Sequence, residues 1–374
     1  MNTTIPMLDL RREYAEIANE IQAGWAASLR EMRLLGGHEV ARFEEEIATY
    51  IGTPAAVALG SGSDALLLGM EALGIGPGDR VILPANAFVA ALEAANHLGA
   101  FPVLVDVTPG GFAPDSAAIS AAMPARAVVA VHLYGHALEL TSLRGTCARH
   151  GALLIEDGSH AHGAARGGRR VGSFGDVGCF SAGVVKNLGA YGDAGFVTTA
   201  EPRIAERIKL LRAHGQERKN HHVRYGYNSR LDELQAVVLR VKLRHLDRRN
   251  QRRRAIAAFY DDRFRPLGIR VPDPGPEEQP VYHQYVIRID QREALQAHLR
   301  EHGIETGIHY PVPLHRQPAW TAVYATALSF PNAERLAQEI LSLPVFPDLT
   351  DGEVEHVAAA VAAFFVDTRR RASR

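Results

Sequence analysis

The sequence has few cysteines, no long apolar run and almost no net charge, and each absence excludes a class of protein. The 374-residue chain holds two cysteines, Cys147 and Cys179, which are too few for a disulfide framework or a cysteine-based metal site. Its 17 histidines are scattered and lack the spacing of metal ligands. We therefore expect no bound metal.

Charge and hydropathy give no sign of a nucleic-acid partner or a membrane. The 41 basic and 42 acidic residues leave a net charge of −1. The main basic cluster, residues 240–254, has the spacing of a solvated helix face rather than of a nucleic-acid site. Neither a run of 18 apolar residues nor a signal peptide is present, so the sequence predicts a cytoplasmic protein.

From residue 55 onward the chain alternates between apolar runs and helical patterns. Seven runs have the length of buried strands, namely AAVAL, RVILP, PVLVD, AVVAVHL, ALLIED, VGCFS and GFVTT. Helical stretches separate them as far as residue 157, which favours parallel pairing. We expect an α/β fold with a mostly parallel seven-stranded sheet sandwiched by helices, and any ligand at the carboxyl ends of the strands.

Length and composition favour two closely packed domains, because 374 residues with 47 % hydrophobic content can bury one large and one smaller core. The predicted division is an N-terminal arm with a large domain over 1–254 and a small α/β domain over 255–374. In the arm, a helical pattern ends at Gly52. In the small domain, VYHQYVIRI predicts a strand, EALQAHLREHG a helix ended by Gly303, and IETGIHYPVPLH a strand that ends in a proline turn.

Lys186 is the only cation between residues 177 and 199, among small and apolar neighbours. Desolvation there disfavours the ammonium and makes the amine available as a nucleophile or base, which suits imine chemistry. Thirty residues upstream, an apolar run ends at Glu156 and Asp157. A lysine for an imine and a carboxylate for a ring nitrogen are the two groups that a pyridoxal phosphate site needs. A lysine that reaches out to water is the structural alternative.

Other candidates come from turns at predicted strand ends. In GSGSDALLLGM, Gly62 and Ser63 begin a helix whose free amides can bind a phosphate, although such a turn is usually only a helix cap. In PANAFVAALEAAN, Phe88 stands where an aromatic is ordinarily part of the core. His132 and Tyr134, at the end of the fourth strand, are candidate pocket walls.

The segment EDGSHAHGA followed by FS-x4-KNLGAYGDAG, together with SGSDAL, resembles the DegT/DnrJ/StrS-type sugar aminotransferases. These are fold-type I enzymes that use pyridoxal 5'-phosphate to aminate nucleotide-linked keto sugars, and the resemblance extends from about residue 5 to about residue 364. It implies that Lys186 binds the cofactor covalently and that Asp157 keeps the ring nitrogen protonated.

The same resemblance implies further cofactor contacts. Gly62, Ser63 and Ser181 would bind the phosphate. Phe88 would lie over the ring, and His160 would contact the phenolic oxygen, with a purely structural histidine as the alternative.

Substrate and partner expectations also come from the resemblance. In GYNSRLDELQA, Asn228 would reach the phosphate of a neighbouring subunit and Arg230 its substrate, which implies a homodimer with shared sites; a helix N-cap is the alternative for Asn228. In HYPVPLH, His309 and Tyr310 would edge the sugar site, or be ordinary loop residues. L-glutamate is the implied amino donor, and a nucleotide sugar the acceptor.

The chain departs from this family at residues 182–185, which read AGVV where many members have FYPT, so Gly183 replaces a tyrosine. The KNLGA and GD elements resemble members that aminate C3 of a thymidine-linked 6-deoxy sugar, and a 4-keto sugar is the alternative. A dehydratase, in which histidine replaces the lysine, and a non-catalytic sensor are rival readings. Lys186 argues against the first, and Lys186, Asp157 and Ser181 together argue against the second.

Overall fold

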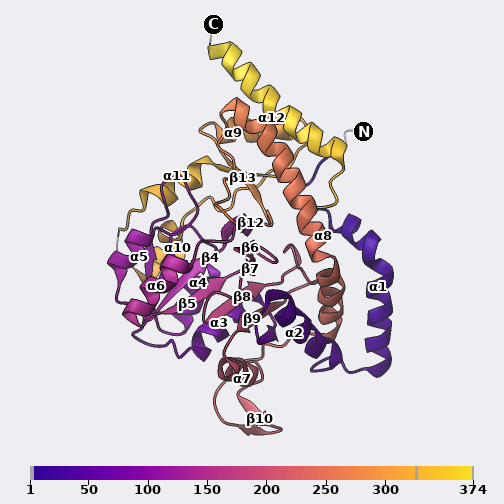
Figure 1. The fold of residues 1–374 in the computed structure, drawn as a ribbon, viewed down its shortest axis with the longest axis vertical. Coiled ribbons are helices and arrows are strands. Elements are labelled where there is room, and N and C mark those ends of the chain that lie inside the picture. Colours follow the sequence, from indigo (N-terminus) through magenta and orange to yellow (C-terminus); the bar gives the residue numbers. More distant parts are fainter. Residues whose placement is uncertain (1–3, 325–326, 373–374) are drawn as a thin grey trace.

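The computed structural model describes residues 4–324 and 327–372, which form a larger and a smaller lobe (Figure 1). The larger lobe contains a seven-stranded sheet of order β1-β9-β8-β5-β4-β2-β3. Its strands are β1 (Ala55–Leu59), β2 (Arg80–Pro84), β3 (Phe101–Val105), β4 (Ala127–Val131), β5 (Leu153–Asp157), β8 (Val177–Ser181) and β9 (Gly195–Thr199). Only β9 runs antiparallel to its neighbours, so the predicted mostly parallel sheet and all seven strands are confirmed.

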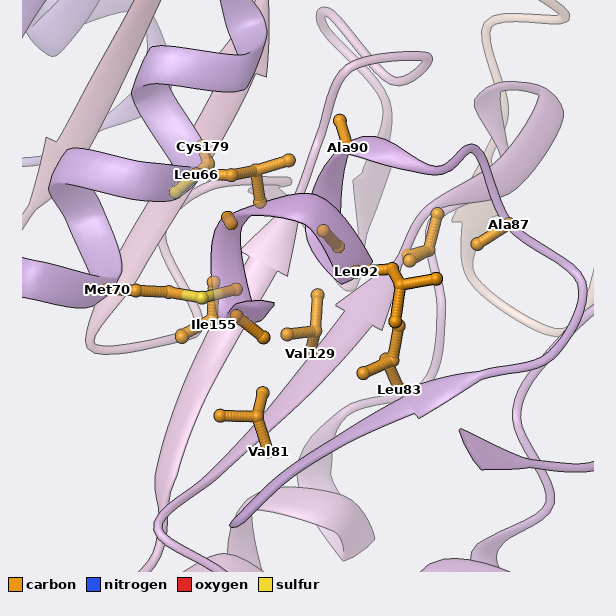
Figure 2. Packing of buried hydrophobic residues seen from close by; sticks show 14 of the residues in the cluster. Leu66, Met70, Val81, Leu83, Ala87, Ala90, Leu92, Val129, Ile155 and Cys179 are labelled. Atoms are coloured by element: carbon orange, nitrogen blue, oxygen red, sulfur yellow. The ribbon is translucent and has the colours of Figure 1, made fainter. Parts of the chain in front are cut away.

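Helices bury both faces of this sheet. Along β2, Val81 and Leu83 face one core and Ile82 faces another, as expected for alternating side chains of a doubly covered strand. Figure 2 shows Val81 and Leu83 beneath the side chains of one helical layer. That layer consists of α3 (Gly62–Ala72), α4 (Ala90–His97) and α7 (Pro202–Leu211). The other face is covered by α2 (His38–Ile51), α5 (Ser116–Ala122), α6 (Thr141–His150) and α8 (Glu233–Phe264).

Short elements connect these layers. They are the strands β6 (Ala165–Arg166), β7 (Arg169–Arg170), β10 (Gln216–Arg218), β11 (His221–His222) and β12 (Glu278–Gln279), and the 3-10 turns Leu133–Gly135, Arg265–Leu267 and Leu314–Arg316. The hairpin of β10 and β11 projects from the body beyond α7 (Figure 1). The predicted end of α2 is confirmed, because Gly52 adopts the left-handed conformation that glycine tolerates best (φ 84°).

The smaller lobe pairs β13 (Tyr285–Arg288) with β14 (Ile340–Leu343). Its helices are α9 (Arg292–Glu301), α10 (Pro318–Val323), α11 (Pro331–Glu339) and α12 (Asp351–Ala372). The predicted strand over residues 304–315 is wrong, since Ile304 and Gly307 make only isolated bridges. Two prolines in that segment lack the N–H that a strand ladder needs, and the chain turns instead.

Helix α8 runs without a break from the larger lobe into the smaller one, past the predicted domain boundary at residue 254 (Figure 1). Its Leu246 packs in a core of the larger lobe, whereas Ile256, Tyr260 and Phe264 pack with the smaller lobe. The two-domain division therefore stays a prediction, with the change of core falling inside one helix.

The expectation that residues 240–254 form a solvated helix face is wrong. Helix α1 (Leu10–Glu31) covers one side of α8 and brings carboxylates against its cations. Lys242 pairs with Glu13 (2.6 Å) and Arg249 pairs with Asp348 (2.6 Å), and both cations are buried. Charge spacing alone does not reveal such partners, because they come from distant parts of the chain.

Residues 4–324 and 327–372 contain neither a helix that could cross a membrane nor a group of metal ligands. None of the helices in that part of the chain combines the length and apolar character needed to cross a bilayer. Residues 4–324 and 327–372 also contain no cluster of three or more histidine, cysteine or acidic side chains arranged to hold a metal ion.

Candidate active site

A cavity lies at the carboxyl ends of β4, β5 and β8, beside the start of α3. Its lining residues are Ser61, Gly62, Ser63, Leu66, Phe88, Ala90, Val131, Leu133, Asp157, Ser159, His160, Ser181, Lys186 and Asp193. Seven of the predicted site residues are among them, although they come from four separate segments of the sequence. The placement is the one expected for a ligand site in a mainly parallel sheet.

Lys186 lies in the loop between β8 and β9, where its backbone N–H closes a turn onto the Gly183 carbonyl (2.9 Å). Burial lowers the pKa of its amine, and the nearby Asp157 charge only partly opposes that effect. Among the described residues, no hydrogen bond or ion pair to the Lys186 amine is formed. A desolvated lysine without a partner is the form in which the neutral amine is most accessible.

The two carboxylates at the end of β5 point to opposite faces of the sheet and have different surroundings. Asp157 lines the cavity and accepts a hydrogen bond from the Ser159 N–H (3.0 Å). Glu156 is fully buried on the other side and accepts three backbone N–H bonds of the 172–175 turn. Burial alone would raise the pKa of Glu156, but His132 and these amides hold it below its usual value.

The candidate pocket walls His132 and Tyr134 are not in the cavity lining. His132 is buried against Glu156 (3.1 Å), while its neighbours Val131 and Leu133 line the cavity instead. Tyr134 is buried and donates its hydroxyl hydrogen bond to the His309 carbonyl. The expectation was wrong because the end of β4 turns these two side chains away from the cavity.

The start of α3 is packed tightly enough that Gly62 is required there. A Cβ on Gly62 would lie 2.4 Å from the Ser181 Cβ, and one on Gly195 would lie 2.1 Å from the Ser61 carbonyl oxygen. Ser61 caps the helix by accepting a hydrogen bond from the Asp64 N–H (3.1 Å). The helix N-terminus therefore opens directly onto the cavity, where its dipole favours an anion.

His160 lines the cavity as a neutral imidazole. Its Nδ1 lies 3.3 Å from the Tyr134 backbone N–H, which can only donate, so Nδ1 is the acceptor and Nε2 carries the proton. Burial, and then the Lys186 charge, lower the pKa of His160 well below its ordinary value.

His309 and Tyr310 lie next to the cavity without being in its lining. Tyr310 packs against Phe88 with ring centroids 5.6 Å apart. His309 forms a hydrogen bond through Nδ1 with the Ser342 hydroxyl (2.8 Å). Burial, and then the Lys186 charge, lower the pKa of His309 to about 4, so it is neutral at physiological pH.

Asn228 and Arg230 are exposed and do not line this cavity. Their side chains contact each other, with Arg230 Nε donating to Asn228 Oδ1 (3.1 Å). Between them, the buried Ser229 donates to Asp64 (2.8 Å) and accepts from the Gly60 N–H (3.1 Å). The segment is thus anchored at the start of α3, while its two predicted functional side chains face outward.

Sequence reasoning missed two polar lining residues, Ser159 and Asp193. The Ser159 hydroxyl accepts a hydrogen bond from the Ser181 N–H (3.0 Å) and so connects the ends of β5 and β8. Its position between Asp157 and His160 in the EDGSH segment was the available signal.

The residues around the cavity fit pyridoxal phosphate. They supply an unpaired amine, a carboxylate, an exposed aromatic ring at Phe88 and a helix N-terminus that suits a phosphate. Gly62 adds a close approach that any side chain would block.

Residues 15–362 match the model of the DegT/DnrJ/EryC1/StrS aminotransferase family. The chain belongs to this family. Its aminotransferases are pyridoxal phosphate enzymes, which confirms the predicted cofactor and the predicted enzyme class.

Two relatives and one solved structure show which members of the family this chain is similar to. The erythromycin biosynthesis sensory transduction protein EryC1 of Saccharopolyspora erythraea is 43 % identical over 96 % of this chain and 99 % of its own. A dTDP-3-amino-3,4,6-trideoxy-alpha-D-glucose transaminase of Streptomyces venezuelae is 42 % identical over 96 % of this chain and 95 % of its own. The crystal structure of S. venezuelae DesV in complex with a ketimine intermediate superposes with a TM-score of 0.95 at 42 % identity, covering 97 % of this chain and 99 % of that one.

Proposed function

We propose that this aminotransferase moves the amino group of L-glutamate to the ketone of a nucleotide-linked sugar. The observation that carries the proposal is the unpaired amine of Lys186 in the same cavity as Asp157 and the N-terminus of α3. Desolvating a lysine without a partner costs stability, so such a lysine in a cavity indicates a functional role rather than a structural one.

Each residue has a role that follows from its chemistry. When bound, pyridoxal phosphate supplies an electron sink for negative charge at the amine-bearing carbon. Asp157 holds the proton on the ring nitrogen, which makes that sink effective. Lys186 would hold the cofactor through its amine and, once free, would serve as the general acid and base that carries the proton. The amides of Gly62 and Ser63, with the Ser181 hydroxyl, bind the phosphate.

For the sugar, we favour a thymidine-linked 3-keto-6-deoxyhexose. The S. venezuelae relative is named for a 3-amino sugar, which supports amination at C3. Gly183 stands where many family members have a tyrosine, and the two residues that follow it, Val184 and Val185, are exposed (38 % and 51 %) on the loop that carries Lys186. More room at that point is the reason to keep a 4-keto sugar as the alternative.

The proposed functional unit is a homodimer with shared sites. Asn228 and Arg230 are exposed and face away from the cavity of their own chain, which supports a role in a neighbouring one. Mixing Lys186→Ala with Asn228→Ala protomers is expected to restore activity, because heterodimers would contain one intact site. Verified heterodimers without activity would contradict shared sites.

A sensor is the second candidate, because one relative is named a sensory transduction protein. Absorbance of the pyridoxal phosphate-loaded protein separates the two. An aminotransferase loses its yellow colour when L-glutamate alone is added and regains it with a keto sugar, while Lys186→Ala does neither. A wild-type protein whose spectrum ignores both substrates would overturn the proposed function.

A further inference from the structure

The segment Val281–Gln284, which leads into β13, is hydrogen-bonded directly to the loop after β4. Val281 N–H donates to the Gly135 carbonyl (2.9 Å), and Gln284 N–H donates to the Tyr134 carbonyl (3.3 Å). A Cβ on Gly135 would lie 2.8 Å from the backbone nitrogen of His283, so there is no room for a larger residue at position 135. The backbone of His283 is therefore fixed relative to the cavity wall.

Asn187, the residue after Lys186, holds the His283 ring in one orientation. Two carbonyls, which can only accept, define the amide directions: Asn187 Nδ2 donates to Val281 O (3.2 Å), and Asn250 Nδ2 donates to His162 O (2.8 Å). Asn250 Oδ1 then accepts from the same Asn187 nitrogen (3.1 Å). Only Asn187 Oδ1 is left to face His283 Nδ1 (3.1 Å), so His283 must carry its proton on Nδ1.

His283 and His160 consequently form a packed pair of opposite tautomers. Their ring centroids are 4.5 Å apart with the planes at 42°. His160 is protonated on Nε2 because its Nδ1 accepts the Tyr134 N–H, and His283 is protonated on Nδ1 because of Asn187. Each ring is thus fixed by one hydrogen bond from a different segment of the chain.

The groups that face His283 keep it uncharged. Burial is the largest cause that lowers its pKa, and the nearby His160, Lys186, Arg253 and His162 act in the same direction. Every one of these neighbours is cationic or becomes so on protonation. Among the described residues, no carboxylate forms a hydrogen bond or ion pair with His283, whose ring hydrogen-bonds to Asn187.

We propose that His283 is a positioning residue: held by Asn187, it packs against His160 and fixes the plane of that imidazole in the cavity lining, while the Tyr134 N–H sets which nitrogen of His160 is the donor. The role of His160 toward the cofactor belongs to the proposed function, and the arrangement of the two rings is independent of it. Through Asn187, the lysine loop, helix α8 and the segment before β13 together fix the His283 ring, and through it the orientation of the His160 ring in the cavity lining.

The first test examines the rings without any cofactor. Nitrogen-15 spectra of histidine-labelled cofactor-free protein distinguish the two tautomers, and His160→Gln and His283→Gln identify the signals. We expect His283 with its proton on Nδ1, His160 with its proton on Nε2, and both neutral from pH 5 to 8. A His283 protonated on Nε2, or charged near pH 6.5, would overturn the proposal even if the protein is an aminotransferase.

The second test measures how the pyridoxal phosphate-loaded protein absorbs light as a function of pH. His283→Leu removes the ring that packs against His160, whose N–H would stabilise the deprotonated form of the bound pyridoxal phosphate. The pH midpoint of the absorbance change is therefore expected to rise by about half a pH unit. Asn187→Leu should give a similar rise in the wild type and no further rise in the His283→Leu background. His283→Gln can still donate to Asn187, so its midpoint should stay close to that of the wild type.

The exposed His150 at the end of α6 provides the matched control, because His150→Leu is expected to leave the midpoint unchanged. Additive shifts from Asn187→Leu and His283→Leu, or an unchanged midpoint in folded His283→Leu protein, would contradict the coupling. If His283→Leu does not fold, the wild-type nitrogen-15 spectra and Asn187→Leu still decide the question.

Discussion

The cavity and the contact between α1 and α8 each contain a desolvated lysine and a buried carboxylate, half-buried Lys186 in the first and buried Lys242 in the second, but only the second region pairs them. Lys242 forms an ion pair with Glu13 (2.6 Å) and packs over the Tyr191 ring. Lys186 has no such partner among the described residues, and Asp157 acts on it only through its charge. Burial lowers the pKa of both lysines, so burial alone does not identify the functional one. The missing partner does.

The largest effect is expected from Lys186→Ala. We predict that turnover falls by at least about 10³-fold, because the residue supplies both the cofactor linkage and the proton transfer. Cofactor binding should persist through Asp157 and the start of α3, as equilibrium dialysis can measure. Substantial glutamate-dependent turnover in this variant would show that the unpaired amine is not the reacting group.

Lys242→Ala is expected to reverse the pattern. It leaves the buried Glu13 without its cation, which costs about 3–5 kcal/mol of stability in comparable cases, measurable by urea unfolding. Activity per folded molecule should stay near that of the wild type. The double replacement Lys242→Met with Glu13→Leu is the control, and we expect it to recover most of the lost stability.

Changing Asp157 and changing its neighbour Glu156 are expected to have different effects. For Asp157→Asn, we expect a rate loss of about 10²-fold with a much smaller change in cofactor affinity, because the ring nitrogen loses its proton while the other contacts remain. The matched change Glu156→Gln should instead lower stability, since Glu156 accepts three backbone N–H bonds and contacts His132. A variant at Asp157 with normal rate would place another group at the ring nitrogen.

His309→Ala is predicted to slow the half-reaction with the keto sugar by about tenfold and to spare the half-reaction with glutamate. The side chain lies beside the cavity and is neutral above a pKa of about 4, so it can contact a sugar without adding charge. Single-turnover absorbance measures the two halves separately. Equal slowing of both would reject His309 as a sugar contact.

The smallest effect concerns stability and pH. Because burial lowers the folded-state pKa of Lys186 below 10.5, the cofactor-free native state loses stability as pH falls below that value. Lys186→Met should therefore raise the melting temperature slightly at neutral pH, and the gain should shrink as pH approaches 10.5. A melting temperature lowered at all pH values would mean that Lys186 is paired in the native state.

The sequence predicted the part of this site that local pattern determines. Apolar runs located the seven strands, and the run that ends at Asp157 placed that carboxylate at a strand end. The contacts of Lys242 and His283 were beyond reach, because each depends on a distant segment packed by the fold: α1 in one case and residues 281–284 in the other. The predicted strand after Gly303 was wrong for a local reason. Its apolar residues have the pattern of a strand, but its two prolines lack the backbone N–H groups that strand pairing needs.

The most direct test uses the fact that the chain has only four lysines, Lys186, Lys209, Lys219 and Lys242. Lys209 and Lys219 are exposed, and Lys242 is ion-paired. The protein is loaded with pyridoxal phosphate, reduced with borohydride, digested and mapped by mass spectrometry. The unpaired amine predicts that the pyridoxyl group is found on Lys186 in nearly every modified chain. Label spread over the exposed lysines, or found on Lys242, would contradict the claim that the half-buried lysine without a partner is the catalytic one.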